Sequence, residues 1–330
     1  MRYFAVGGVM MGVRHCTALG VLLICLAVAE AVARSVYSAP WYERLAAEQG
    51  EHREFPYERN RYNLRGPAHA HPKPDGVRRI LFLGDSFTFG MGVERDEDTF
   101  VRILERRLTE RLAPEGVEGV ETFNGAIIGS LTDLWMEVWD EMKTRFDPDL
   151  VVFVFFLRDG TLSGSIPEFF EEIRNEVALR NRGSTLYRVS YLYRLYRDAL
   201  DAALIREHHT ARFVDAYFGT EEQTAEWIRA RERLLRIRDD ARSRSVRTAF
   251  VVFPILAGLG EGYQFEPICA LLEEFAREAG LPTHSLLEAF RDEHGPDLWI
   301  SAHDQHPNEA AHAIAAESLL GFLGGLLTED

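Results

Sequence analysis

Three side chains far apart in the sequence have the types needed to turn a hydroxyl into a nucleophile. Ser86 stands in the run Leu-Gly-Asp-Ser-Phe-Thr (residues 83–88), between a strand-like and a helix-like stretch. Asp304 and His306 stand in the run Asp-Gln-His-Pro-Asn (residues 304–308), near the other end of the chain. An imidazole can take the proton of a serine hydroxyl, and a carboxylate can orient that imidazole. The sequence therefore predicts nucleophilic catalysis, with Ser86 as the residue that reacts.

The place of Ser86 suits this chemistry. It directly follows the first predicted strand and opens a helix, so free backbone N–H groups and the helix dipole favour a negative charge beside it. Asp85 and Ser86 would serve equally well as helix-capping residues. The run by itself leaves both interpretations open.

Apolar runs alternate with segments of helical spacing along most of the chain. Strands are expected at residues 79–83, 120–123, 150–157, 248–253 and 284–287. Helices are expected over residues 100–112 and 268–276, and over a last segment that begins at Pro307 and runs through Leu326. This alternation predicts a doubly wound parallel sheet, which places sites at the carboxyl ends of its strands.

Residues 160–245 interrupt this alternation as a helical insertion, with helices expected at about 186–205 and 225–243. The stretch 186–197 combines tyrosines with arginines. It fits an amphipathic helix packed on the core, or a lid that faces a membrane or covers a substrate, since both side-chain types suit an interface.

Three short blocks resemble those of the SGNH (GDSL-type) hydrolases, an esterase and lipase family. Residues 82–87 look like the first block and residues 124–129 like the second. Residues 304–308 look like the last, in the Asp-x-His spelling of some branches. The resemblance extends over roughly residues 79–326. It implies the flavodoxin-like three-layer α/β/α sandwich of that family.

The resemblance also implies roles for individual residues. Ser86 would attack an ester carbonyl, His306 would take its proton and hand it to the leaving alcohol, and Asp304 would hold the imidazole in the right tautomer. Backbone N–H groups of Ser86 and Gly129 would stabilise the oxyanion. Pro307, at the first helical position, would keep His306 just outside the last helix.

In the third block of the family, this chain differs from the usual sequence. Where the family has an asparagine before an aspartate, this chain has Arg158 before Asp159. Losing one oxyanion donor typically costs about 3 kcal/mol, or ~100- to 1,000-fold in rate. Arg158 brings five N–H donors and fits three roles: a charged oxyanion donor, a partner of Asp159, or a site for an acidic substrate group.

The first 34 residues form an apolar segment, with Arg2 and Arg14 ahead of the uncharged run 17–29. That order suits a signal peptide that is cleaved, and equally a signal anchor that stays. Either way, basic residues on its N-terminal side predict that the rest lies outside the cytoplasm, tethered or secreted. Residues 35–76, with several prolines, are expected to be an irregular approach to a hydrolase domain at 77–330.

The net charge and the spacing of the histidines limit which ligands the protein is expected to bind. A net charge of −15 disfavours nucleic acid as a ligand, because phosphate binding needs a basic face. His303 and His312 stand near Asp304 and His306, but no second group of ligands follows at His-x-x-x-His spacing. We therefore expect no metal site, His303 in a loop and His312 on a helix surface. The predicted chemistry needs no cofactor.

Together these features predict an extracytoplasmic ester hydrolase that works through an acyl-serine. Tethering to a cell envelope favours an acylated glycan or a lipid ester as substrate, and the sequence does not choose between them. Two alternatives stay open: an O-acyltransferase that uses the same serine, and a non-catalytic glycan-binding protein in which Arg158 marks the loss of activity. Oligomeric state is not indicated.

Overall fold

The structure is a computed structural model that describes residues 5–40, 43, 57–161, 166–301 and 304–328. It comprises two compact units. One contains residues 1–51 and 164–210, and the other contains residues 52–163 and 211–330. The predicted boundaries at residues 34, 76, 160 and 245 stay predictions.

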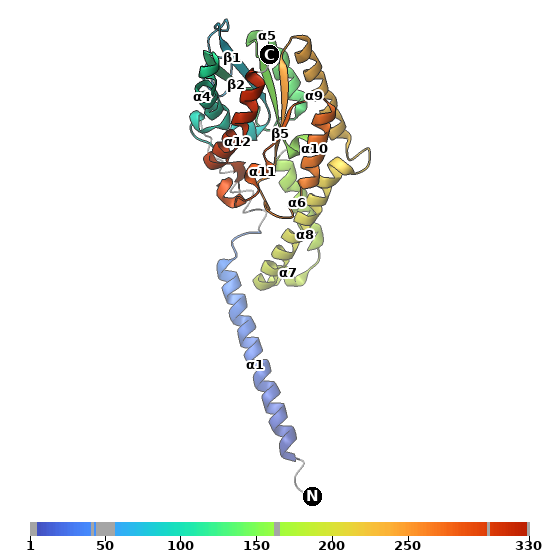
Figure 1. Ribbon diagram of the computed structural model, residues 1–330. Helices are drawn as coiled ribbons and strands as arrows, with labels where there is room; N and C mark the ends of the chain where they lie inside the picture. Colours follow the sequence, from blue (N-terminus) through green and yellow to red (C-terminus); the bar gives the residue numbers. More distant parts are fainter. Residues whose placement is uncertain (1–4, 41–42, 44–56, 162–165, 302–303, 329–330) are drawn as a thin grey trace. The chain divides into compact units, whose positions relative to one another are not determined.

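The larger unit contains a five-stranded parallel sheet (Figure 1). Its strands are β1 (Val77–Leu83), β2 (Gly119–Asn124), β3 (Leu150–Phe156), β4 (Arg247–Phe253) and β5 (Thr283–Ser285). They lie in the order β2-β1-β3-β4-β5, and every pair is parallel. This is the flavodoxin-like order, in which the chain reverses its direction of winding beside β1. The predicted fold class is confirmed.

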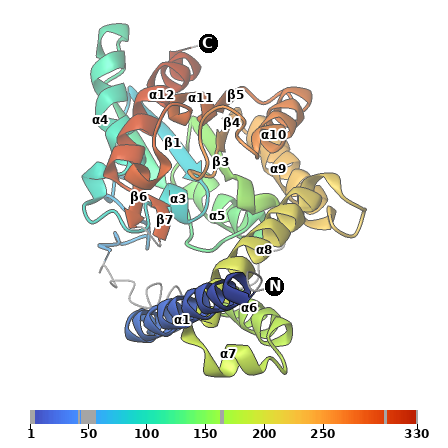
Figure 2. The same cartoon turned by 90° about the horizontal axis from the view of Figure 1, so that it is seen from below.

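Helices cover both faces of this sheet (Figure 2). Side chains alternate along each strand, so β3 sends Val151 and Phe153 into one core and Val152 and Val154 into the other. The first core is completed by α5 (Thr132–Arg145), α9 (Ala225–Ser243) and α10 (Glu266–Glu278). The second is completed by α4 (Phe100–Leu112), α11 (Leu287–Phe290) and α12 (Glu309–Thr328). The three layers follow directly from strands that are apolar on both faces.

The ends of some elements differ from the predicted ones. Leu157 does not extend β3 but opens the short helix η3 (Leu157–Gly160), and Leu287 opens α11 rather than ending β5. The predicted helix at 186–205 is two helices, α7 (Thr185–Val189) and α8 (Tyr191–Phe218), which meet at Ser190. A short antiparallel pair was not predicted, formed by β6 (Trp299–Ser301) and β7 (Asp304–Pro307) after the turn η4 (Gly295–Leu298).

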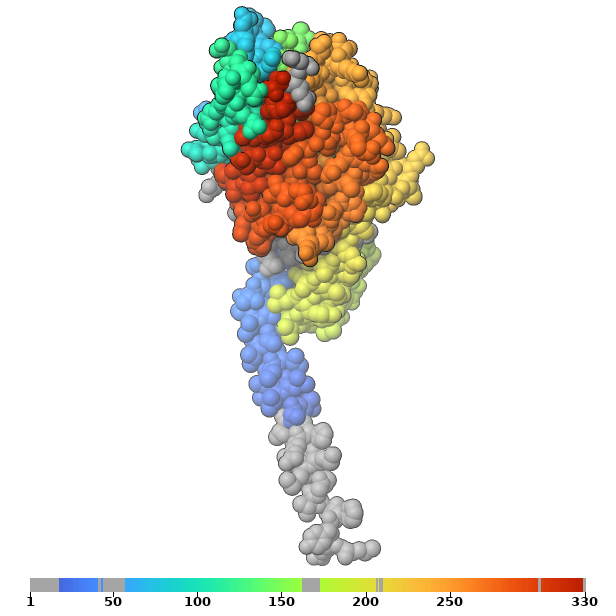
Figure 3. Space-filling model, viewed as in Figure 1, coloured from blue at the N-terminus to red at the C-terminus, as the bar shows by residue number. Residues whose placement is uncertain are grey.

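The smaller unit combines α1 (Ala5–Val36) with α6 (Ile166–Arg180), α7 and the first part of α8. Most described side chains of α1 are exposed although they are apolar (Figure 3), for example Leu22 at 55% and Ile24 at 65%. An apolar helix that does not bury its side chains within the protein needs another apolar environment.

Two helices among the described residues are long and apolar enough to cross a membrane, over Ala18–Val36 and Glu309–Thr328. The second is α12, which is more than half buried and packs on α4. It is a core helix. The first is almost entirely uncovered, which is compatible with the predicted signal or anchor segment.

Candidate active site

Ser86 lies at the carboxyl end of β1, as the first residue of α3 (Ser86–Phe89). Asp85 caps this short helix, since its carboxylate accepts a hydrogen bond of 2.9 Å from the backbone N–H of Phe87. Gly84 makes the turn possible, because a Cβ there would lie 2.1 Å from the hydroxyl oxygen of Thr88. The turn leaves Ser86 only 5% exposed, with its side chain aimed at the β6–β7 hairpin.

The three residues predicted to do chemistry meet in one line of hydrogen bonds. Nε2 of His306 lies 2.9 Å from Oγ of Ser86, and Nδ1 of His306 lies 2.5 Å from Oδ1 of Asp304. The same carboxylate oxygen accepts the backbone N–H of His306 at 3.0 Å. This geometry fixes a tautomer, because an ionised carboxylate accepts and Nδ1 must therefore carry the proton. Nε2 is then free to accept the proton of the Ser86 hydroxyl.

The β6–β7 hairpin holds His306. In its register Trp299 faces Pro307, and Ser301 faces Asp304. The prediction that Pro307 begins the last helix was wrong, because it ends β7 instead. The helix is capped one residue later by Asn308, whose side-chain amide oxygen accepts from Ala311 N–H at 3.1 Å. The extended backbone of β7 turns the His306 ring toward Ser86. A helix that began at Pro307 would not by itself place the ring there.

The loop after β2 lies against the turn that carries Ser86. Ile127 donates its backbone N–H, and Ser130 its hydroxyl, to the carbonyl of Gly84, at 3.1 and 3.2 Å. Between them Gly129 has a φ of +75°, which favours glycine. Among the hydrogen bonds of the described residues, none uses the backbone N–H of Gly129 or of Ser86. Both donors are therefore available to a ligand.

Arg158 lies in η3, at the carboxyl end of β3, and faces Asp85 rather than Asp159. Its Nη2 is 3.6 Å from Oδ2 of Asp85, while Asp159 accepts the backbone N–H of Phe156 at 2.9 Å. Burial raises the pKa of Asp85, and the Arg158 charge opposes that rise. Burial, followed by the charge of Asp85, raises the pKa of Asp159 well above its usual range. Arg158 and Asp85 therefore lie as neighbours behind Ser86, while Asp159 is turned toward the backbone of Phe156.

Comparisons with known proteins identify the family. Residues 82–314, more than two thirds of the chain, match the model of the GDSL-like lipase/acylhydrolase family. The chain belongs to this family. Its matched region includes Ser86, Gly129, Arg158 and His306, and the predicted family resemblance is confirmed. A comparison with curated proteins finds no match.

Several solved structures are similar to this GDSL-like chain at low identity. TesA is 16% identical, with 76% of this chain and 100% of that chain covered and a TM-score of 0.44. A lipase/acylhydrolase from Enterococcus faecalis is 15% identical, with coverages of 76% and 97% and a TM-score of 0.41. Axe2, an acetylxylan esterase from Geobacillus stearothermophilus, is 16% identical, with coverages of 75% and 94% and a TM-score of 0.43. Identities this low say nothing about the substrate of this chain.

Arg65 of this GDSL-like chain supports the short helix that carries Ser86, and the sequence analysis did not identify it. Its side chain is 2% exposed and donates to the carbonyls of Phe89, Gly90 and Val93, which end α3 and form the loop behind it. A cation at a helix C-terminus satisfies carbonyls that lack partners within the helix. Arg65 belongs to the segment 35–76, where no periodicity marks a residue as buried, so no sequence signal could have found it.

The prediction that His312 lies on a helix surface was wrong. It is fully buried in α12, where its Nδ1 accepts the backbone N–H of Phe100, the first residue of α4, at 3.1 Å. Burial, with a smaller contribution from Arg65, lowers the pKa of His312 to about 3. His303 falls outside the described residues. Within those residues, no group of three or more His, Cys, Asp or Glu side chains is arranged to hold a metal ion.

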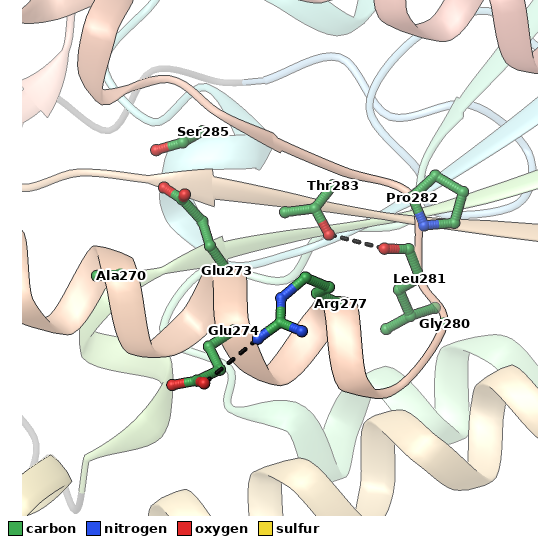
Figure 4. Close-up of a pocket in the computed structure, with 9 residues that line it drawn as sticks. All are labelled: Ala270, Glu273, Glu274, Arg277, Gly280, Leu281, Pro282, Thr283 and Ser285. Atoms are coloured by element: carbon green, nitrogen blue, oxygen red, sulfur yellow. Dashed lines mark hydrogen bonds and ion pairs between the residues drawn. The ribbon is translucent and has the colours of Figure 1, made fainter.

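A hollow at the edge of the sheet lies apart from these residues. It has a volume of about 760 Å³ and is lined by residues of α10 and of the stretch that leads into β5 (Figure 4). Its charged side chains include Glu274 and Arg277, which pair with each other at 3.3 Å. None of Ser86, Asp304 and His306 contributes to it, and its lining offers no activated nucleophile. Ser86, the residue predicted to react, lies instead at the carboxyl end of β1, where the topology predicts a site.

Proposed function

We propose that this protein is a serine ester hydrolase in which Ser86, His306 and Asp304 act as a catalytic triad. One observation carries the proposal: His306 joins the hydroxyl of Ser86 on one nitrogen and the carboxylate of Asp304 on the other, at 2.9 and 2.5 Å. Family membership supports ester hydrolysis in general. The identity of the nucleophile and the base rests on this geometry.

The first half of the reaction forms an acyl-enzyme. Oγ of Ser86 attacks the carbonyl carbon of the ester while Nε2 of His306 takes the hydroxyl proton. The tetrahedral intermediate collapses with cleavage of the bond between the acyl carbon and the alkoxy oxygen, and His306 gives the proton to the departing alcohol. Asp304 holds the imidazole in the reactive tautomer and stabilises its positive charge in between.

The second half releases the acid. A water molecule attacks the acyl carbon while His306 takes one of its protons, and the bond from that carbon to Oγ of Ser86 then breaks. His306 returns the proton to Ser86, so the enzyme is restored and one water is consumed per ester cleaved.

Three groups are proposed to stabilise the oxyanion in both halves. The backbone N–H groups of Ser86 and Gly129 are the first two, and neither has a partner among the described residues. Arg158 takes the place of the family's amide donor. Its Nη2 makes no hydrogen bond among the described residues, and its side chain is 31% exposed, so it can turn toward a developing negative charge.

We also propose that the apolar segment remains attached as an anchor and that the active site lies outside the cytoplasm. The carboxylate of Glu30, within α1, accepts hydrogen bonds from Ser190, Tyr191 and Leu192, at 2.7, 2.8 and 3.0 Å. A segment that caps a helix 160 residues later in the chain is part of the folded protein, which favours an anchor over a cleaved leader. An anchored enzyme suits acylated envelope glycans or lipid esters as substrates.

The proposal is tested by ester hydrolysis and by labelling with a serine-reactive fluorophosphonate. The full-length protein should cleave acetyl and longer-chain esters and be labelled once, and Ser86→Ala should lose both properties. Ser243→Ala, at an exposed position of α9, is the matched control and should keep them. Hydrolysis that survives in Ser86→Ala would refute the mechanism, and an intact protein that is never labelled would favour a non-catalytic binding protein.

The same acyl-serine could pass its acyl group to a sugar hydroxyl instead of water. Product analysis in the presence of an oligosaccharide acceptor separates the two reactions. Release of free acid at a rate that does not depend on the acceptor supports hydrolysis, whereas acylated sugar as the main product would make the protein an O-acyltransferase.

A further inference from the structure

A patch of apolar side chains is exposed on the smaller unit. Leu186 and Val189 of α7 are each 58% exposed, and Tyr196 of α8 is 60% exposed. Leu179, near the end of α6, is 67% exposed. The first three lie within eleven residues of one another. Leucine and valine on a short surface helix indicate a partner that excludes water from them.

The stretch of sequence that contains this patch is basic, although the chain as a whole is acidic. Residues 177–197 contain five arginines and no aspartate or glutamate, in a protein of net charge −15. Four tyrosines lie in the same stretch. Three of the arginines, Arg180, Arg182 and Arg188, are exposed, and Arg180 pairs with Glu176. Arginine attracts phosphate, and tyrosine is enriched where a polar layer meets an apolar one, so this composition suits the headgroup layer of an anionic membrane.

The patch is attached to the apolar helix α1. Glu30 binds the first residues of α8 directly after α7, and it lies six residues before the end of α1, or roughly 9 Å along the axis. Figures 1 and 2 show α7 beside α1, with α8 leading away from it. Since α1 is 32 residues long, roughly 48 Å, it exceeds a hydrocarbon core of about 30 Å, and its last turns fall in the headgroup layer.

Aromatic and charged contacts hold this junction together. Asp198 of α8 accepts hydrogen bonds from the hydroxyls of Tyr37 and Tyr187, both at 3.0 Å. The guanidinium groups of Arg34 and Arg194 lie 4.7 and 4.5 Å from the ring centre of Tyr191. Ala33 of α1 is only 2% exposed, so one side of this end of the helix is packed. The junction fixes α7 at the depth at which α1 leaves the apolar layer.

We propose that α7 is a second membrane contact: Leu186 and Val189 insert into the outer surface of the bilayer that α1 crosses, and Arg182 and Arg188 bind the phosphates of anionic phospholipids there. The inference depends on α1 being retained as an anchor, and it does not depend on the ester hydrolase chemistry of Ser86. It gives the unit around α1 a function of its own, which is to bind the chain to lipid at two places.

The test measures the depth of α7 in vesicles. A polarity-sensitive fluorophore is attached to Leu186→Cys or Val189→Cys in the full-length protein with Cys16 and Cys25 changed to alanine. Cys269 can stay, because it is buried and burial raises its pKa to about 12. Leu204→Cys is the matched control, on the exposed side of α8 and thirteen residues after its first residue. Lipids with a quencher attached near the headgroup should quench positions 186 and 189 several-fold more than position 204.

The lipid composition identifies the ligand. Quenching at position 186 should be stronger in vesicles of phosphatidylcholine with phosphatidylglycerol than in phosphatidylcholine alone, and Arg182→Gln with Arg188→Gln should remove that difference. Glu30→Gln should weaken quenching at 186, because it loosens the link to α1 while leaving α1 in the bilayer.

Three results would overturn the proposal. One is equal quenching at positions 186, 189 and 204. Another is a blue-shifted emission at 186 without lipid quenching, which would assign the patch to a protein partner or a second copy. The third is a mature protein whose mass shows that residues 1–34 have been removed. Ester hydrolysis by the labelled proteins is measured alongside, so that a failed hydrolase and a failed membrane contact are told apart.

Discussion

Arg158 is where this chain departs from the pattern of its family, and its surroundings explain how the change is tolerated. The carboxyl of Asp85 is fully buried directly before Ser86, where an uncompensated charge would be costly. Arg158 supplies the compensation at 3.6 Å and still has an Nη2 without a hydrogen bond. One side chain therefore stabilises the turn that carries the nucleophile and offers a donor at the proposed oxyanion site.

Substitutions of Arg158 separate these two roles. Arg158→Ala should lower kcat by roughly 100- to 1,000-fold with a smaller effect on KM, because the donor acts on the transition state. Arg158→Asn, which restores the family's amide, should recover most of the loss in kcat. Steady-state kinetics with one ester substrate and thermal unfolding of both variants provide the measurements. An unchanged kcat in Arg158→Ala would exclude a role in oxyanion binding.

Asp304 is predicted to act through the tautomer of His306. In Asp304→Asn the amide can donate to Nδ1, which would move the imidazole proton to Nε2 and leave Ser86 without a base. We expect a fall in kcat on the order of 10⁴-fold. The loss of stability should be about 1 kcal/mol, because one oxygen of Asp304 accepts both N–H groups of His306 and an amide nitrogen in its place cannot accept from the backbone. Single-turnover kinetics would measure the acylation step. A loss below about tenfold would mean that another group orients His306.

The short helix α3 depends on a partner from outside the sheet. Arg65 reaches three carbonyls at its C-terminal end and pairs with Asp96 at 3.6 Å. Arg65→Met should leave the carbonyl of Val93 without its donor, while those of Phe89 and Gly90 keep only longer bonds, from Asn124 at 3.4 Å and from Val93 N–H at 3.2 Å. We expect a cost of roughly 3 kcal/mol, since hydrogen bonds to charged groups contribute about 1.5–3 kcal/mol each. Denaturant unfolding measures the loss. Arg102→Met is the control, because Arg102 pairs with the same Asp96 but lies on α4, and it should cost less.

The side chain of Asn308 joins the β6–β7 hairpin to the start of α12. The amide of Asn308 donates to the carbonyls of Asp297 and Trp299, at 2.8 and 3.1 Å, and its oxygen caps α12. Asn308→Ala should cost about 1–2 kcal/mol for the cap and lower kcat more than KM, because His306 loses its fixed position. Asn308→Asp keeps the cap but cannot donate to either carbonyl, so it separates the effect of the cap on stability from the effect of the hairpin on kcat. Equal kcat in the wild type and Asn308→Ala would show that the hairpin is held by other contacts.

The elements of the sheet could be predicted because their sequences are apolar on both faces, whereas the hairpin could not. Phe153 and Val154 each lie in a core, one on either side of β3, so a continuous apolar run is itself the signal of a central strand. In β6 and β7 no such run exists, and their pairing depends on Asn308 and on the contact with Ser86. The break at Ser190 was missed for a similar reason, since the residues that open α8 donate hydrogen bonds to Glu30, far away in the sequence.

For the whole molecule, the order of the blocks predicted the site while the contacts that support it stayed hidden. Ser86 and His306 lie 220 residues apart and meet because β1 is an inner strand of the sheet and the chain returns to its end after α11. The family resemblance predicted that both residues lie at the carboxyl ends of the strands. Arg65, Asn308 and His312 had no such pattern, because each acts through backbone groups of another element, which a single sequence does not reveal.

His312 makes the stability of the molecule depend on pH. It joins α12 to the start of α4, and its buried Nδ1 must stay unprotonated to accept the N–H of Phe100. Because burial lowers its pKa from 6.5 to about 3, the unfolded chain binds a proton between these values that the folded chain does not. The contribution of His312 to the free energy of unfolding should therefore have its full value above pH 6.5. It should fall by about 1.4 kcal/mol for each pH unit below that.

The comparison with His312→Gln isolates this effect from the other groups that titrate in acid. Glutamine keeps an acceptor for Phe100 and cannot be protonated in this range, so the variant should be less stable than the wild type at pH 7 and lose less stability on acidification. The difference in unfolding free energy between the two proteins, measured by denaturant titration from pH 7 to pH 4, should shrink steadily below pH 6.5. A difference that stays constant over this range would show that His312 is not held neutral in the core.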